Sequence, residues 1–182
     1  VNAVLRRYLI EKSKLEQKTR GVVGIQYNMR KELLDKIKEQ HQSWREVVRC
    51  MQQESRICLR VNPRKISQQA FIAELDKQKV LYHKDSQSGA IILLKSTNIL
   101  LIPGYEQGWF AVISAANQQM IQALPAVSKG KEVRALDACA APGGKSVLLR
   151  EKYGKEASIV ATDVDMERLE VLEENNQRLD LN

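Results

Sequence analysis

The run DACAAPGGKS, residues 137–146, constrains the fold more than any other part of the sequence. An apolar run from Val133 to Leu136 precedes it, and a pattern of helical periodicity follows it. The order of strand, tight glycine turn and helix is typical of a βαβ unit, which directs backbone N–H groups and the positive end of a helix dipole at one ligand. The run therefore predicts a site for a ligand that carries a carboxylate, a phosphate or a ribose.

Two common nucleotide motifs agree poorly with this run. The dinucleotide motif G-x-G-x-x-G needs spaced glycines, but Gly143 and Gly144 are adjacent. The P-loop motif G-x-x-x-x-G-K-[ST] agrees with the end of the run, but its first glycine would fall on Cys139. Pro142, moreover, has no N–H to donate to a phosphate. Both phosphate-binding interpretations are therefore disfavoured.

S-adenosylmethionine is a third ligand, and it has no phosphate. It needs a close backbone turn for its amino-acid part and a carboxylate after the second strand for its ribose hydroxyls. Asp163 follows the predicted strand Ser158–Thr162 and lies 20 residues after Gly143, the offset at which an acid meets a ribose in such units. Asp165 directly precedes the next helical pattern and is the better N-cap. The sequence thus predicts S-adenosylmethionine as the cofactor, with Asp163 on the ribose.

The periodicity of the remaining chain predicts an α/β protein in three parts. From Val133 onward, strand, loop, helix (144–153), strand and helix (from Met166) alternate, which predicts the start of a doubly wound, Rossmann-like sheet. A small α+β module on an antiparallel sheet and a helical segment are expected before it. In the helical segment, we expect an amphipathic helix over residues 1–18, a linker over Thr19–Tyr27 and two further helices capped by Asn28 and Ser43.

In the module, we expect a helix capped by Ser67 and four strands: Ile57–Asn62, Val80–His83, Ala90–Leu94 and Ile99–Ile102. The turn-rich connector 103–110 then leads to a helix capped by Ser114.

Charge is distributed unevenly along the chain. Residues 1–55 hold 12 basic and 7 acidic side chains, residues 56–130 hold 9 and 4, and residues 131–182 hold 8 and 11. The basic surface therefore lies outside the predicted cofactor region, which favours a polyanionic partner for the first 130 residues, although a merely solvated basic surface stays open. Within it, Arg60, Arg64 and Lys65 form a basic cluster that either contacts phosphate or is solvated.

The three cysteines have no C-x-x-C spacing, so neither a disulfide framework nor a zinc site is predicted, and no metal is expected. Cys50 and Cys58 are interpreted as core residues. Cys139, within the glycine run, is interpreted as a wall of the cofactor pocket rather than as a nucleophile. Since no apolar run reaches membrane-spanning length, no membrane partner is expected, and a cytoplasmic location is the default.

At residues 136–146 the chain resembles the bacterial RNA cytosine-5 methyltransferases of the Sun/RsmB group, which modify a cytosine of 16S ribosomal RNA. Residues 1–7 resemble the last helix of their NusB-like RNA-binding domain, residues 59–62 their ferredoxin- or RRM-like domain, and Gly108-Trp109 with Gln118 their connector. The resemblance implies four parts: 1–18, the end of the NusB-like domain; 19–55, a helical linker; 56–103, the RRM-like domain; and 104–182, the connector and the beginning of the cofactor-binding domain. It also implies that the cofactor is lined by Cys139, Ala140, Ala141, Pro142, Gly143, Gly144, Lys145 and Asp163.

The resemblance also implies a reaction that needs thiolates. In this family a cysteine adds to C6 of the cytosine so that C5 can take the methyl group, and both working cysteines lie in a Pro-Cys and a Thr-Cys. Neither dipeptide occurs here, so the nucleophile is expected beyond Asn182 and the 182 residues are expected to be inactive alone. The alternative is a non-catalytic RNA-binding protein with a vestigial cofactor fold. The resemblance implies 16S ribosomal RNA as the partner, the alternative predicts RNA binding in general, and a monomer that binds no DNA is expected.

Overall fold

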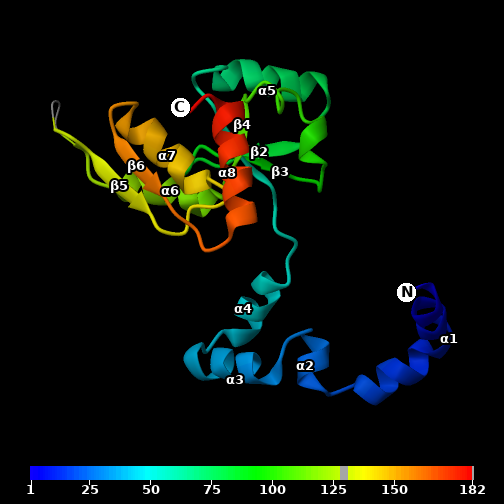
Figure 1. Ribbon diagram of the computed structural model, residues 1–182. Coiled ribbons are helices and arrows are strands. Elements are labelled where there is room, and N and C mark those ends of the chain that lie inside the picture. Colours follow the sequence, from blue (N-terminus) through cyan, green and yellow to red (C-terminus); the bar gives the residue numbers. More distant parts are fainter. Residues whose placement is uncertain (128–130, 182) are drawn as a thin grey trace. The chain divides into compact units, whose positions relative to one another are not determined.

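The computed structural model describes residues 1–127 and 131–181, which divide into two compact units, Val1–Ser55 and Arg56–Asn182. Figure 1 shows the helices and strands of both units. Among the described residues, no helix combines the length and the apolar character needed to cross a membrane.

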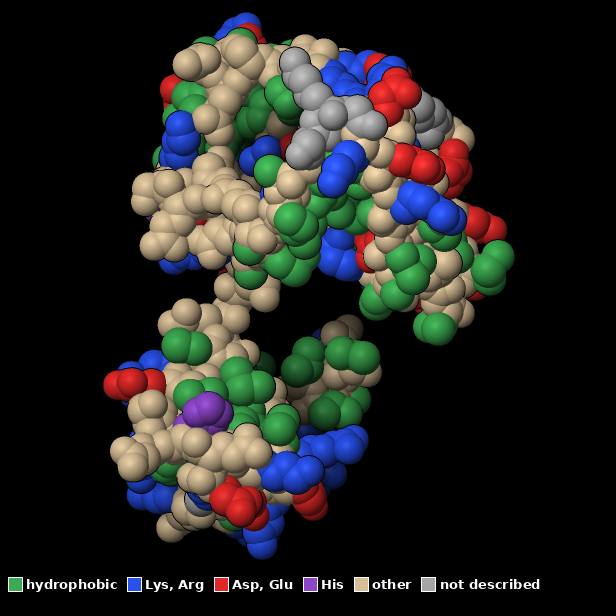
Figure 2. Space-filling model, turned by 90° about the vertical axis from the view of Figure 1, so that its left-hand side faces the viewer, with side chains coloured by type: hydrophobic (Ala, Val, Ile, Leu, Met, Phe, Trp, Pro, Cys, Tyr) green, Lys and Arg blue, Asp and Glu red, His purple; other side chains and the backbone are tan. Residues whose placement is uncertain are grey.

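The first unit is helical, and among its described side chains the buried core lies in its second half. Leu34, Ile37 and Val48 are buried against one another, with Trp44 packed on them. The first helix buries none of its side chains among the described residues. Blue Lys and Arg side chains lie beside green hydrophobic ones on the face of this unit seen in Figure 2. Its helices are α1 (Asn2–Thr19), α2 (Val23–Gln26), α3 (Lys31–Gln40) and α4 (Trp44–Met51).

Three expectations for this unit are wrong in detail. The expected linker contains the short helix α2. Asn28 has φ +44°, so it lies in a left-handed turn and does not cap α3, which begins after Arg30. Cys50 is exposed rather than a core residue, because Val47 and Val48 already occupy the face of α4 that turns towards the core.

The second unit begins with a four-stranded antiparallel sheet in the order β2-β3-β1-β4. Its central strand β1 has alternating burial, with Leu59 and Val61 facing a core closed by Phe71 of α5. Cys58 lies on the opposite face and is half-buried. Ser67 caps α5 as predicted, because its hydroxyl accepts the N–H of Ala70. The elements are β1 (Cys58–Val61), α5 (Gln68–Lys77), β2 (Tyr82–Lys84), β3 (Ile91–Leu93), η1 (Ile99–Leu101) and β4 (Phe110–Val112).

The fourth strand of this sheet lies later in the chain than predicted. Residues 99–101 form a 3-10 turn, not a strand, because the side chain of Asn98 accepts the N–H of Leu100 and starts a turn there. The edge of β1 is filled instead by β4, where Val61 pairs with Phe110. The connector therefore contributes a strand to the small domain.

A parallel pair of strands follows, in the strand–helix alternation expected of a doubly wound sheet. β5 and β6 pair in register from Arg134 with Ser158 to Asp137 with Ala161. One face of the pair is open, since Leu136 is 66% and Val160 55% exposed. The elements of this part are α6 (Ala115–Ala123), β5 (Arg134–Asp137), α7 (Gly144–Tyr153), β6 (Ser158–Ala161) and α8 (Met166–Leu179).

Candidate cofactor site

The glycine loop joins β5 to α7 as predicted and is fixed at both ends. The N–H of Thr162 donates to the carbonyl of Asp137, and the N–H of Ala140 to that of Thr162, both at 2.9 Å, so the loop starts in register with the end of β6. Gly143 then turns the chain into α7 with φ +108°, which is accessible to glycine at little cost. A Cβ on Gly143 would also lie 3.3 Å from Cγ of Leu172, so α8 packs closely against the turn.

The N-terminus of α7 offers open donors. Gly143 caps the helix without a side-chain hydrogen bond, and the first backbone bond of the helix runs from the N–H of Val147 to the carbonyl of Gly143. The N–H groups of residues 144–146 thus have no partner within α7, as at any helix start. They are among the backbone N–H groups that the sequence analysis expected to point at the ligand.

A buried carboxylate braces the loop from inside. Asp137 is 4% exposed, and one of its oxygens accepts the hydroxyl of Ser146 at 2.9 Å. The ammonium group of Lys145 lies 3.3 Å from the other oxygen and also donates to the carbonyl of Cys139. The side chain of Lys145 therefore folds back on the loop, and its predicted contact with the cofactor stays a prediction.

Asp163 lies where the sequence placed it, at the end of β6 and against the loop. One carboxylate oxygen accepts the N–H of Ala141 at 3.1 Å, and the other accepts that of Asp165 at 3.2 Å. These backbone bonds, first that from Asp165, hold the pKa of the Asp163 carboxyl below its usual value. A charged carboxylate accepts about four hydrogen bonds, so two acceptor positions are left for a ligand such as a ribose diol. Asp165 caps α8 as predicted, since its side chain accepts the N–H of Arg168.

Three residues of α8 support the loop, and the sequence interpretation missed all of them. The guanidinium of Arg168 donates to the carbonyl of Ala141 at 2.8 Å, and the amide of Asn175 donates to that of Pro142 at 3.2 Å. Leu172 lies between them on the same helix. Their spacing of three to four residues places them on one helix face, and that periodicity was available as a signal.

The thiol of Cys139 lies on an exposed residue of the loop. Within the described part of the chain, no group of three or more potential metal-binding His, Cys, Asp or Glu side chains occurs. The exposed position is compatible with the predicted role of Cys139 in lining the cofactor.

The basic cluster makes contacts within the molecule, but Arg64 and Lys65 remain exposed to solvent, so a contact with phosphate stays a prediction. Arg60 binds Glu151 of α7 at 2.8 Å, and Lys65 lies 3.4 Å from the carboxylate of Asp180. Arg64 donates to the carbonyl of Asp180 at 2.8 Å. The cluster joins the small domain to α7 and the end of α8.

These features define a class: a ferredoxin-like domain followed by the first βαβ unit of a Rossmann-like methyltransferase domain. The profile of a ferredoxin-like domain, "Methyltr_RsmF/B-like", matches residues 31–100, and that of the "16S rRNA methyltransferase RsmB/F" family matches residues 118–182. The chain belongs to the RsmB/F methyltransferase family.

Curated relatives agree with this assignment. The ribosomal RNA small subunit methyltransferase B of Erwinia tasmaniensis is 33% identical over 98% of this chain and 41% of its own length. The protein of the same name from Vibrio cholerae is 31% identical over 100% of this chain and 41% of its own length. The chain thus spans about two fifths of these relatives.

Solved structures share the fold. A methyltransferase homolog protein from Pyrococcus horikoshii matches with a TM-score of 0.62 and 28% identity over 75% of this chain and 44% of its own. NSun6 from the same organism, solved with SFG, an S-adenosylmethionine analogue, matches with a TM-score of 0.71 and 16% identity over 84% and 63%. The fold class expected from the sequence is therefore confirmed.

Proposed function

We propose that this chain binds S-adenosylmethionine at the glycine loop and provides the cofactor- and RNA-binding part of a methyltransferase that acts on C5 of a cytosine in 16S ribosomal RNA. The observation that carries the proposal is the position of Asp163. Its charged carboxylate lies against the loop with acceptor positions left for two ribose hydroxyls. Membership of a methyltransferase family supports S-adenosylmethionine as the ligand.

The residues of the loop suit a ligand without phosphates. Open N–H groups at the start of α7 suit the carboxylate of the methionine part, and the exposed Cys139 and Pro142 leave room along the loop. The bound cofactor would supply an electrophilic methyl group. The chain's own residues bind and orient it, and we propose that these 182 residues alone transfer no methyl group, because they contain neither a Pro-Cys nor a Thr-Cys.

The partner in this proposal is ribosomal RNA. The basic excess over residues 1–130 supports binding to a polyanion, and relatives are named as ribosomal RNA methyltransferases. We propose a cytoplasmic monomer that binds no DNA.

Calorimetric titration with S-adenosylmethionine and with its demethylated product tests the proposal. Asp163→Asn keeps the shape of the side chain but replaces an acceptor by a donor, so we expect affinity to fall by about 10- to 100-fold, the equivalent of losing charge-assisted hydrogen bonds. Glu167→Gln removes an exposed acid from the first turn of α8 and is the matched control.

The outcomes separate the two candidate functions. Equal cofactor affinities for the wild type and Asp163→Asn would show that Asp163 does not bind the cofactor. No binding of either ligand by the wild type, together with salt-dependent RNA binding, would replace the proposal by the non-catalytic RNA-binding function.

A further inference from the structure

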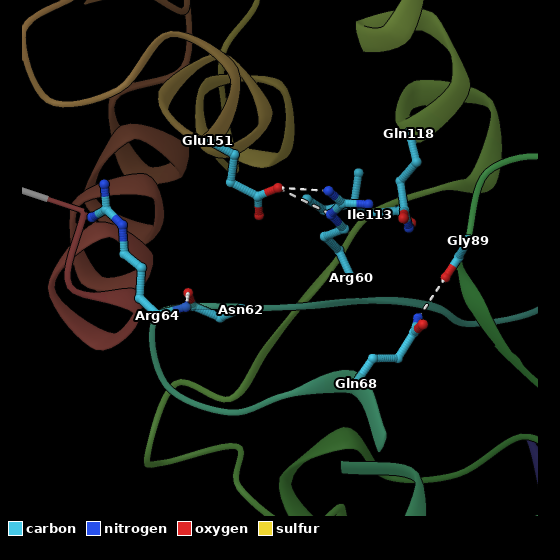
Figure 3. Close-up of polar contacts among 8 residues, drawn as sticks. All are labelled: Arg60, Asn62, Arg64, Gln68, Gly89, Ile113, Gln118 and Glu151. Carbon is cyan, nitrogen blue, oxygen red and sulfur yellow. Dashed lines mark hydrogen bonds and ion pairs between the residues drawn. The ribbon is translucent and has the colours of Figure 1, made fainter. Parts of the chain in front are cut away.

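The segment at the end of β1, residues 60–65, faces the methyltransferase part, and we call it the docking segment. Figure 3 shows Arg60 extending to Glu151 of α7. Its Nε and one terminal nitrogen donate to the same carboxylate oxygen at 3.0 and 2.8 Å. Since the carboxylate is only 14% exposed, solvent screens this pair less than a surface pair.

Asn62 is the buried centre of the docking segment. It is 5% exposed, and its amide nitrogen donates to the carbonyls of Gly108 at 3.1 Å and Leu179 at 2.9 Å. Its amide oxygen accepts the N–H of Arg64 at 3.1 Å. The carbonyl of Leu179 belongs to the last residue of α8, where helix carbonyls have no partner within the helix. A side chain of the small domain therefore caps the C-terminus of α8.

The backbone of the connector touches α8 directly at the same place. Gly108 has φ +69°, and a Cβ there would lie 2.0 Å from the carbonyl oxygen of Arg178. The guanidinium of Arg178 donates back to the carbonyls of Tyr105 and Phe110, at 2.8 and 3.1 Å. The C-terminal turn of α8 is thus held from both sides.

The same helix supports the glycine loop with residues between its first turn and Asn175. Arg168 and Asn175 bind the carbonyls of Ala141 and Pro142, and Leu172 packs on Gly143. One continuous helix joins these contacts to those of Asn62. A helix transmits its axial position over its length, so moving or loosening its end shifts the groups that support the loop.

We propose that the docking segment, through Asn62 and α8, sets the position of the cofactor loop, which makes Asn62 a positioning residue for cofactor binding. The identity of the ligand rests on the function proposed above, whereas the mechanical connection does not. The small domain, in this view, prepares the cofactor site of its neighbour.

Hydrogen exchange of the full chain, measured by mass spectrometry without any ligand, tests the connection. Asn62→Asp keeps the size and the acceptor of the side chain but loses both donations, to Gly108 and Leu179. We expect the hydrogen-bonded amides of Ala140, Ala141, Gly143 and Val147 to exchange about tenfold faster, because local opening of the loop becomes easier. The amides of β1 and β3 should keep their rates. A purely structural role would instead raise exchange throughout the unit.

Gln68→Ala is the matched control. It removes the 3.0 Å bond from Gln68 to the carbonyl of Gly89, which lies within the small domain and is drawn in Figure 3. We expect it to leave the exchange of the loop unchanged. Equal loop exchange in Asn62→Asp and wild type would overturn the proposal.

Arg64→Gln provides a milder variant should Asn62→Asp not fold. It removes an exposed bond to the carbonyl of Asp180, just past the end of α8, and we expect a smaller rise, about threefold, at the same loop amides. No rise in this variant would count against the proposal.

Cofactor titration supplies the second arm. We expect Asn62→Asp to weaken binding of S-adenosylmethionine about tenfold, and its effect to be non-additive with that of Asn175→Ala, because both act through α8. Additive effects would contradict the route through α8. A wild-type chain that binds no ligand would refute the proposed function, yet the exchange experiment would still decide the positioning role.

Discussion

At the scale of single residues, the carboxylate of Asp163 anchors the loop and, in the function that we propose, also binds the ligand. Two backbone N–H groups hold it against the loop, and this same anchoring fixes the direction of its remaining acceptor positions. The side chain of Lys145 points back to the loop instead, because its ammonium group contacts the carboxylate of Asp137 and donates to the carbonyl of Cys139. The sequence predicted the location of both residues but not the direction of their side chains, which depends on buried partners.

The lowered pKa of Asp163 predicts a pH dependence of the loop. Its bonds contribute stability above about pH 4, where the unfolded carboxyl is ionised, and that contribution is lost as the pH falls through the lower folded pKa. Following the amide resonance of Ala141 by NMR should give a titration midpoint below about 4. The midpoint should vanish in Asp163→Asn, and a midpoint above 4 would contradict the anchoring described here.

At the scale of elements, capping residues and periodicity predicted the helices of the second unit well. Ser67, Ser114 and Asp165 cap helices as expected, and α7 has the predicted bounds. The prediction failed at residues 99–102, whose apolar composition is compatible with either a strand or a turn. A local hydrogen bond to the side chain of Asn98 gives a 3-10 turn there, and β4 pairs with the edge of the sheet instead. Strand pairing is a long-range choice that local patterns do not determine.

The close packing of α8 on the connector predicts a position that accepts no side chain. Gly108→Ala should lower the free energy of unfolding by at least about 2 kcal/mol more than Gly154→Ala, as measured by urea denaturation. Both glycines have positive φ, +69° and +76°, but a Cβ on Gly154 would meet no atom within 4 Å. The difference therefore isolates the clash with α8, and equal losses would show that the connector moves away freely.

At the scale of the whole molecule, the contacts of the docking segment lay beyond what the sequence could predict. The partners of Arg60 and Asn62 are 91 and 117 residues away along the chain. A basic cluster near a proline gives no sign of such partners, so it was interpreted as a phosphate or solvent contact. The overall division into a basic first part and a cofactor part, by contrast, follows from charge and periodicity alone.

The division of the chain between Ser55 and Arg56 predicts that cofactor binding can be separated from much of the RNA binding. Deleting residues 1–55 should leave the unfolding midpoint of the second unit and its cofactor affinity unchanged. The deletion removes 12 of the 29 basic side chains, so RNA affinity and its dependence on salt should both fall. Filter binding across a salt series measures this, and an unchanged slope would assign RNA binding to the second unit.

The hydrogen bond from Asn62 to the carbonyl of Leu179, at the end of α8, has a thermodynamic consequence for the whole molecule. Coupling between two equilibria is reciprocal: if domain docking tightens cofactor binding by some factor, the cofactor must tighten docking by the same factor. A filled glycine loop would then make the small domain and its neighbour behave as one body when they meet RNA. An empty loop would leave them freer, so nucleic acid would be held with different affinities in the presence and in the absence of the methyl donor.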